Sequence, residues 1–306
     1  MDIQKFVDLC SEIKEAIKWG AFTYADIEKD APLYHYTSID GLKGIIESKK
    51  FWATEYHFLN DDDEFTYCDG LLQEMLKEEY SSCAFYNPLA LCITEAMIGY
   101  RFHMETVQDS FYVVSFSKNS DNLTLWSEFA GQGCNIRTKD FQLFSDIENI
   151  RYQGSVLYNR GEQKKRLWQA MLDVAEGVTS TNIENKRQLK EVIENMNQQE
   201  YRPFADVLVH LVSFYGMAMK RPQFAAEEEY RVIFDSKGKD IKYRQKDGLL
   251  LPYIELGLQE DLEAMQEIKL APRSRGELSK YSMRSFLAAK GLARCDVSES
   301  EMSLKY

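Results

Sequence analysis

The chain has 306 residues, of which 44% are hydrophobic and 13% aromatic, which is enough apolar surface for a packed core. Its formal net charge of −12 argues against an unspecific nucleic-acid binder, because such proteins need lysine and arginine to displace counterions. Nucleic acid as a substrate stays open. The six cysteines are scattered without a CxxC pair and the first residues do not resemble a signal peptide, so we expect a soluble, cytoplasmic protein with reduced thiols.

The first half of the chain alternates between helical and strand patterns. An amphipathic helix is expected first, and a later helix is expected to be capped by Thr37 or Ser38. Acidic residues at 60–64 are expected to open a further helix. In order, the predicted elements are a helix over 3–19, a strand over 33–36, a helix from 39 to 46, a strand over 51–54, a helix from 60 to 76, a helix over 88–108, a strand over 111–117 and a short helix over 121–129.

The second half is expected to be helical between residues 160 and 220. The pattern predicts a charged, exposed stretch over 183–201 and a buried, nearly all-apolar helix over 204–219, a run too short to span a bilayer. The elements predicted after it are a strand over 229–234, a turn at 247–248 before 249–251, a last core strand over 268–270 and a helix over 281–290.

No internal repeat, low-complexity tract or linker divides the chain. We therefore predict one α+β domain over residues 1–306, with a helical insertion at about 160–220. That insertion is a candidate surface for a homo-oligomer or another partner. The alternative is that its apolar faces pack on the protein's own core.

His35 and Glu229 are the first candidates for chemistry. A histidine at the end of a strand can donate a hydrogen bond to a ribose hydroxyl, and the alternative is a core histidine satisfied by the backbone. In a strand, Glu229 and Arg231 share one face. A carboxylate there can bind a 2′-hydroxyl and stabilise an oxocarbenium-like transition state, and the alternative is an ion pair with Arg231.

Several other polar and aromatic residues carry two interpretations. Ser115 and Ser117 end a strand, where hydroxyls bind a ligand or cap the following turn. Trp52 and Tyr56 are able to stack on a flat ring, although aromatic residues of strands are more often core. The acidic run at 60–64 resembles a magnesium site, but capping of a helix explains it better, so no metal is expected.

Two groups of segments resemble known families. The run from Leu33 to Thr37, followed by a helix and 51–54, resembles the first half of the ADP-ribosyltransferase fold, and 229–235 is similar to the strand with the catalytic glutamate in the polymerase-like branch. The whole chain also resembles a bacterial domain-of-unknown-function family. The segments that carry this second resemblance are 34–37, 60–64, 115–117 with 125–126, and 227–231.

The resemblance implies an α+β fold built on an ADP-ribosyltransferase-like split β-sheet. It implies NAD as a substrate, His35 and Thr37 on the dinucleotide, and Trp52 or Tyr56 on nicotinamide. Glu229 would be the catalytic carboxylate, and Glu227 would orient or deprotonate the acceptor. The remaining residues expected in the cofactor site are Tyr36, Asn60, Ser115, Ser117 and Arg231.

The implied activity is ADP-ribosyl transfer to a protein or nucleic acid, with a bacterial toxin or phage-defence effector as the role. An NAD glycohydrolase and a catalytically silent nucleotide-binding or sensor module are the alternatives. One departure concerns residues 129–134, Phe-Ala-Gly-Gln-Gly-Cys, where the family has a histidine in the turn. If that turn contributes to the pocket, acceptor choice or activity changes.

Overall fold

The computed structural model describes residues 32–59, 64–103, 110–138, 143–246, 248–258, 261–272 and 274–302. The chain forms two compact units. The helical unit comprises Met1–Phe22, Leu59–Ser110 and Leu157–Pro222, and the sheet unit comprises Thr23–Phe58, Phe111–Val156 and Gln223–Tyr306. The predicted helix over 3–19 and residues 60–63 lie outside the described residues.

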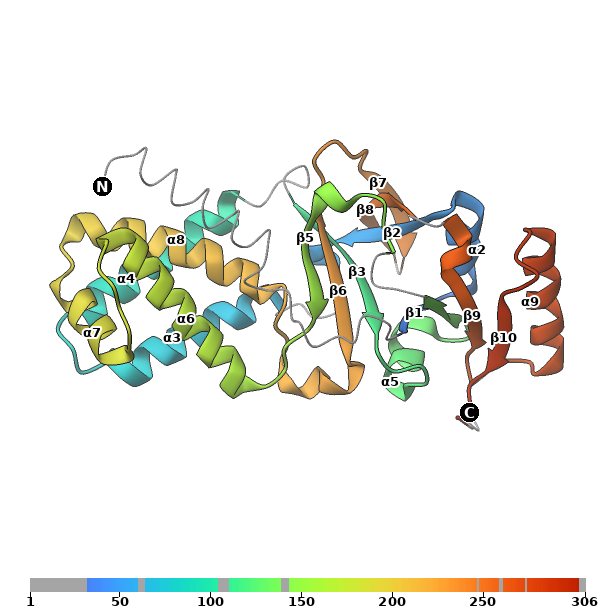
Figure 1. The fold of residues 1–306 in the computed structure, drawn as a ribbon, viewed down its shortest axis with the longest axis horizontal. Helices are drawn as coiled ribbons and strands as arrows, with labels where there is room; N and C mark the ends of the chain where they lie inside the picture. The colour runs from blue at the N-terminus through green and yellow to red at the C-terminus, as the bar shows by residue number, and fades with distance from the viewer. Residues whose placement is uncertain are drawn as a thin grey trace. The chain divides into compact units, whose positions relative to one another are not determined.

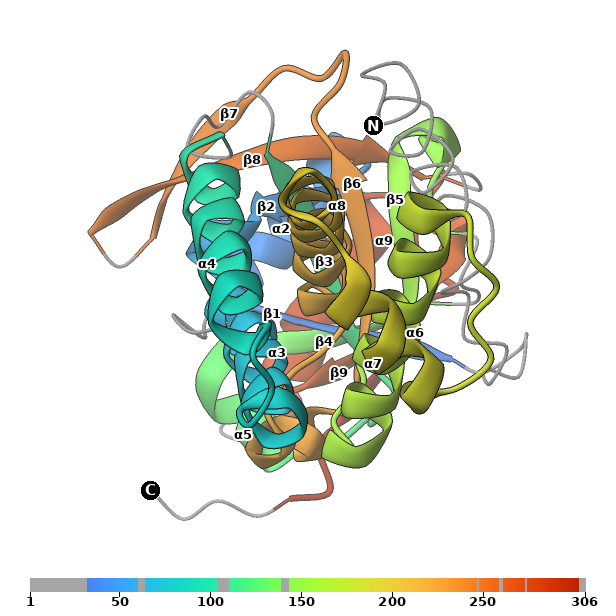
Figure 2. The ribbon, with the colours of Figure 1, turned by 90° about the vertical axis from the view of Figure 1, so that its left-hand side faces the viewer.

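The helical unit is organised around one apolar helix, α8 (Gln198–Gly216), which packs against three others. Figure 2 shows α8 among its neighbours. The buried helix predicted from residue 204 is confirmed, since Phe204, Leu208 and Val212 are fully buried. The other helices of the unit are α3 (Glu64–Tyr80), α4 (Tyr86–His103), α6 (Arg160–Thr179) and α7 (Lys186–Asn195).

The predicted exposed stretch over 183–201 is wrong in one respect. It is two helices, because α7 ends at Asn195 and α8 begins at Gln198. Leu189 and Ile193 of α7 are fully buried, so this stretch also contributes to the core of the helical unit. Among the described helices of the chain, none is both long and apolar enough to cross a bilayer.

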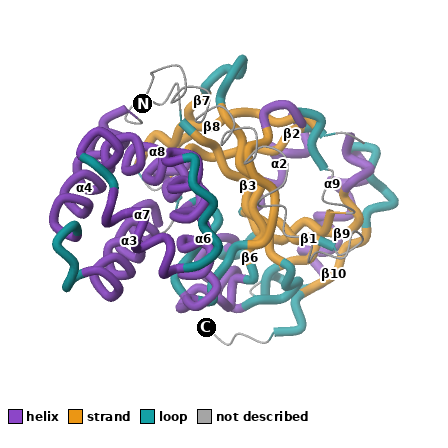
Figure 3. The backbone as a smooth tube through the Cα atoms, turned by 60° about the vertical axis from the view of Figure 1, so that its left-hand side comes forward, coloured by secondary structure: helices purple, strands orange, loops and turns teal. Residues whose placement is uncertain are grey.

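The sheet unit holds one open, mixed sheet, drawn as arrows in Figure 1 and in orange in Figure 3. Neighbouring strands are antiparallel except for β9 and β10, which are parallel. The mixed α/β character predicted from the sequence is confirmed. The strands are β1 (Leu33–Thr37), β2 (Lys50–Glu55), β3 (Phe111–Ser117), β4 (Cys134–Thr138), β5 (Ile150–Ser155), β6 (Glu229–Asp235), β7 (Lys242–Lys246), β8 (Leu249–Gly257), β9 (Met265–Leu270) and β10 (Asp296–Glu299).

The sheet branches at β3. One edge of β3 pairs with β6 along its whole length, from Phe111 to Ser117. The other edge pairs with β2 only at Tyr112 and Val113, and with β1 only at Ser117. The sheet therefore divides into two arms, β1-β4-β9-β10 and β2-β8-β7. We call the stretch of this edge between the two pairings, residues 114–116, the fork.

Helix α2 (Ile39–Ser48) connects the two arms, because it follows β1 and precedes β2. Ser38 caps it by accepting a hydrogen bond from the Gly41 amide at 3.0 Å, which confirms one of the two predicted caps. Besides short 3-10 turns, the described part of the unit holds three more helical segments. They are α5 (Leu123–Leu125), the π-helical turn Trp126–Ala130 and α9 (Glu277–Ala289).

Four strands were not predicted, and each has a weak sequence pattern. β4, β5 and β7 are short and largely polar, and β10 reads Asp-Val-Ser-Glu. The prediction that 268–270 is the last core strand is confirmed, because Ile268 and Leu270 of β9 are buried. β10 pairs with β9 after it as an edge strand without a buried residue. Strands of this kind owe their position to their partners rather than to alternating hydrophobic residues.

The turn at residues 129–134 approaches the start of α2 closely at Gly133, and a substitution there tests this contact. A Cβ on Gly133 would lie 2.8 Å from both the Ala130 carbonyl oxygen and the Ser38 Cα, which are backbone atoms that cannot move aside. We expect Gly133→Ala to lower the free energy of unfolding by about 2–3 kcal/mol. Gly70→Ala, in open space on the exposed side of α3, should raise it by about 0.5–1 kcal/mol. Calorimetric unfolding of both variants checks this, and equal effects would contradict it.

Candidate functional site

His35 lies at the fork and binds its backbone. Its Nδ1 is 2.9 Å from the carbonyl oxygen of Ser115, and a carbonyl only accepts, so Nδ1 carries the proton. The imidazole also packs against the rings of Phe51 and Phe116, with centroids 5.2 and 5.6 Å away. One side chain of β1 thus contacts β2 and β3, where the two arms diverge.

Burial lowers the pKa of His35 to about 4, so the ring is neutral at physiological pH. With the proton on Nδ1, Nε2 holds a lone pair and accepts a hydrogen bond. The expectation that His35 donates to a ribose hydroxyl is therefore reversed. A hydroxyl of the ligand would donate to Nε2.

Trp52 on β2 belongs to a cluster built by the other arm. Its ring lies 5.2 Å from that of Tyr253, and the guanidinium carbon of Arg244 lies 5.7 Å from the Trp52 ring centre. Arg244 also donates through Nη2 to Thr54 Oγ1 at 2.7 Å. The positive charge of Arg244 makes a small contribution to the lowered pKa of His35, after desolvation by burial.

Sequence reasoning did not single out Arg244. It lies in the polar hairpin strand β7, where the alternation of charged residues is typical of a solvated edge. Only the register of β7 with β8 and of β8 with β2 brings Arg244 to Trp52 and Thr54. No local pattern carries that information.

Glu229 and Arg231 form a buried ion pair on β6. The Nε and Nη2 atoms of Arg231 donate to the two carboxylate oxygens of Glu229 at 2.6 and 2.9 Å. Both side chains are buried. Ser117 lies opposite Glu229 and Ser115 lies opposite Arg231. The ion pair therefore lies on the strand next to β3, on the side away from the fork.

Ser117 contacts Glu227 through the backbone carbonyl of Glu227 and not through its carboxylate. Ser117 Oγ donates to the Glu227 carbonyl oxygen at 2.7 Å and accepts from the Asn119 amide at 3.0 Å. This is the turn-capping role kept as an alternative for the serine. The Glu227 side chain is buried, and its neighbour Glu228 is exposed and adopts a φ of 45°.

Tyr36 holds the loop that follows β3. Its hydroxyl donates to the Asn119 carbonyl oxygen at 2.8 Å and accepts from the Asn122 amide at 3.0 Å. Its ring packs edge-on against Trp126, with centroids 4.7 Å apart. Burial raises the pKa of Tyr36 to about 12. The tyrosine is thus occupied by the loop, which we call the hub loop (residues 118–122).

Asp121 fixes the hub loop from the other side. Its carboxylate accepts from Trp126 Nε1 at 2.6 Å, from Ser300 Oγ at 2.6 Å and from the Glu301 amide at 2.8 Å. Three of the segments that carried the resemblance thus meet at or beside this loop. They are 34–37, 115–117 with 125–126, and 227–231. Their shared residues join the strands of the sheet.

The remaining predicted residues are Tyr56, Thr37 and Asn60. Tyr56 follows β2 and is buried, with its ring 4.0 Å from His57 and 6.3 Å from Phe111. Thr37 ends β1 against the first turn of α2. Asn60 lies outside the described residues.

A cavity of about 440 Å³ lies elsewhere in the sheet unit, between α2 and α9. Lys43 and Arg275 are among its lining residues, and none of the predicted site residues is. Within the described part of the chain, no three His, Cys, Asp or Glu side chains are grouped as a metal site would require.

We expect His35→Asn to change the pH dependence of stability. The folded-state pKa of His35 lies below its ordinary value of 6.5, so the unfolded chain binds the extra proton and stability is lost as the pH falls from 6.5 towards 4. Asparagine keeps a donor for the Ser115 carbonyl and does not titrate. The free energy of unfolding of the wild type should fall relative to the variant by about 1.4 kcal/mol per pH unit in this window. Parallel curves in urea titrations would contradict the buried, neutral imidazole.

Tyr36→Phe should destabilise the protein by about 1–3 kcal/mol, because a buried amide and a carbonyl of the hub loop lose their partner. Tyr34→Phe on the same strand is the matched control, with an expected change within about 0.5 kcal/mol. Chemical denaturation measures both. Similar values for the two variants would show that the Tyr36 hydroxyl does not hold the loop.

Comparison with known proteins adds no function to this geometry. No protein-family model matches the chain, and no curated protein or solved structure is similar to it. The function must therefore be argued from the fork and the residues around it.

Proposed function

We propose that the chain is an NAD-dependent ADP-ribosyltransferase that modifies a macromolecule, either a protein or a nucleic acid. The observation that carries the proposal is the branching of the sheet at β3, with His35 of one arm bound across the fork to Ser115. Such a split sheet is what the resemblance of β1, β2 and β6 implies. It supports the fold of that superfamily without establishing the reaction.

In this proposal the dinucleotide binds at the fork. The adenosine-side ribose donates to His35 Nε2, and Thr37 helps to position the dinucleotide. Trp52 or Tyr56 stacks on nicotinamide, and the indole of Trp52 lies beside the guanidinium of Arg244. The neutral state of His35 suits this role, since an imidazolium would offer no acceptor.

Glu229 is the catalytic residue of the proposal. The nicotinamide-ribose 2′-hydroxyl donates to its carboxylate, which stabilises the positive charge developing at the anomeric carbon. The two hydrogen bonds from Arg231 leave each oxygen a further lone pair for that hydroxyl. Nicotinamide leaves with the electron pair of the glycosidic bond, the acceptor forms the new bond to the anomeric carbon, and its proton passes to Glu227.

The buried ion pair also favours a second candidate, a catalytically silent nucleotide-binding or sensor module. A carboxylate that holds a buried guanidinium has a structural reason to exist without any reaction. An NAD glycohydrolase would use the same residues with water as the acceptor, and would accumulate free ADP-ribose. By family analogy, a transferase of this kind would serve as a bacterial toxin or phage-defence effector.

The test is nicotinamide release from NAD by the purified protein, with and without a cell lysate. Glu229→Gln should lower the rate by roughly 100- to 1000-fold, because the lost charge acts mainly in the transition state. Glu228→Gln, next to it but exposed, is the matched control and should keep the rate. Release that depends on lysate identifies a transferase, and release without it a glycohydrolase.

Glu229→Gln also removes the charged partner that binds Nε and Nη2 of the buried Arg231, and breaking such a pair costs roughly 3–5 kcal/mol of stability. The double variant Glu229→Gln with Arg231→Met removes the charge as well and should recover most of that loss. Full activity in either folded variant, or no nicotinamide release by the wild type, would refute the transferase and leave the silent module.

A further inference from the structure

Arg244 is a half-buried cation to which the described residues offer no counter-charge. Its Nη2 donates to the Thr54 hydroxyl, and no carboxylate of the described residues forms an ion pair with it. Its Nε–H is buried and finds no acceptor among the residues that the structure describes. Desolvation by burial lowers the pKa of Arg244. A charge removed from water without a partner costs free energy in the ligand-free protein.

Trp52 presents a second donor of the same kind. Its indole Nε1–H is buried and likewise finds no acceptor within the described part of the chain. The ring lies 5.2 Å from that of Tyr253, and its far edge contacts Gly44, where a Cβ would come within 2.7 Å of the indole. These contacts hold the indole in place, with the guanidinium carbon of Arg244 5.7 Å from its ring centre.

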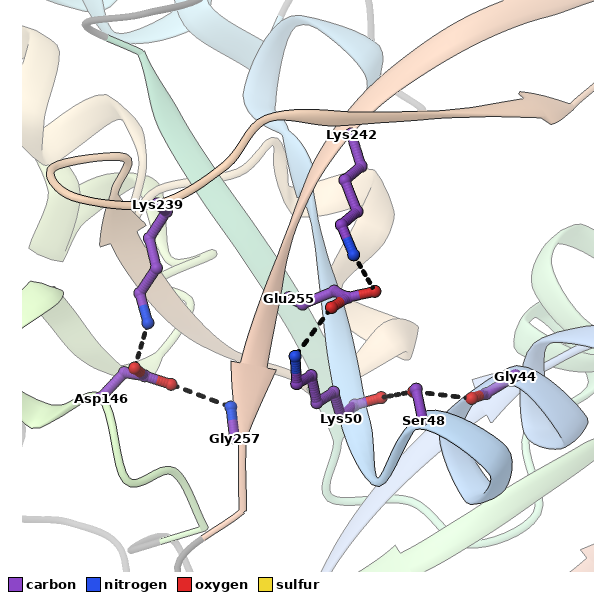
Figure 4. A network of polar contacts seen from close by, with 8 residues as sticks. All are labelled: Gly44, Ser48, Lys50, Asp146, Lys239, Lys242, Glu255 and Gly257. Atoms are coloured by element: carbon purple, nitrogen blue, oxygen red, sulfur yellow. Dashed lines mark hydrogen bonds and ion pairs between the residues drawn. The ribbon is translucent and has the colours of Figure 1, made fainter.

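Two lysines of the same arm share one carboxylate. Glu255 on β8 binds both Lys50 and Lys242 at 2.9 Å, as Figure 4 shows. Lys239 likewise pairs with Asp146 in the same view. Arg231, which is buried on β6, has Glu229. Arg244 differs from these residues because it is withdrawn from water and no described carboxylate pairs with it.

We propose that Arg244 and the indole N–H of Trp52 form an oxyanion subsite that takes a phosphate group of the ligand. A phosphate supplies the missing negative charge, and guanidinium groups bind it well. Its tetrahedral oxygens point in several directions, so one group accepts from two donors that need not be parallel. The proposal rests on the proposed function only for the identity of the ligand, a dinucleotide whose diphosphate would occupy this subsite.

Inorganic pyrophosphate is the probe, with its affinity for the full chain measured by calorimetry. Arg244→Met should lose at least tenfold in affinity, and Trp52→Phe, which keeps the ring but not the N–H, roughly three- to tenfold. Lys242→Met is the matched control, since Lys242 lies on the same strand and is already paired with Glu255. Its affinity should change less than threefold.

Ligand-free stability gives an independent measurement. Removal of an unpaired, half-buried charge should leave the melting temperature of Arg244→Met unchanged or raised, whereas a structural arginine would lower it. No binding of pyrophosphate by the wild type, or equal binding by wild type and Arg244→Met, would overturn the subsite. Pyrophosphate binding that needs Arg244, together with no nicotinamide release, would refute the transferase and keep the subsite. Nicotinamide release without Arg244-dependent binding of pyrophosphate would refute the subsite and keep the transferase.

Discussion

The hydrogen-bonding requirement of β3 governs the sheet unit. A buried strand must satisfy the backbone groups on both of its edges. On one edge β6 supplies a complete ladder, whereas on the other β1 and β2 each supply one end. The His35 side chain binds the Ser115 carbonyl in the interval between them. The imidazole N–H therefore donates the hydrogen bond that a backbone amide donates elsewhere in the sheet. The two arms diverge at this point.

The same arrangement explains why residues that suggest chemistry are often structural in this protein. Tyr36, Ser117 and Trp126 all bind the hub loop or its ends, and so hold β1, β3 and β6 together at one point. A motif that joins strands and a motif that binds a ligand look alike in a sequence. What distinguishes Arg244 and Trp52 is that their buried donors have no acceptor in the described structure.

Much of the core could be predicted, because its pattern is local. The β-branched and aromatic run of β3, the cap at Ser38 and the apolar length of α8 all follow from short-range periodicity. The shared face of Glu229 and Arg231 follows from the strand period as well. The place of Arg244 does not, because it depends on two registers between strands far apart in the chain. Which ring nitrogen of His35 carries the proton likewise depends on Ser115, which lies 80 residues away in the chain.

The central claim is that the fork at β3 is where a nucleotide binds. A crystal structure of the protein grown with NAD tests it most directly. The account predicts a ribose hydroxyl at His35 Nε2, the diphosphate at Arg244 and nicotinamide beside Trp52, with the Glu229 carboxylate facing the anomeric carbon. NAD bound away from the fork, for example in the cavity between α2 and α9, would contradict it, as would a fork that stays empty at saturating NAD.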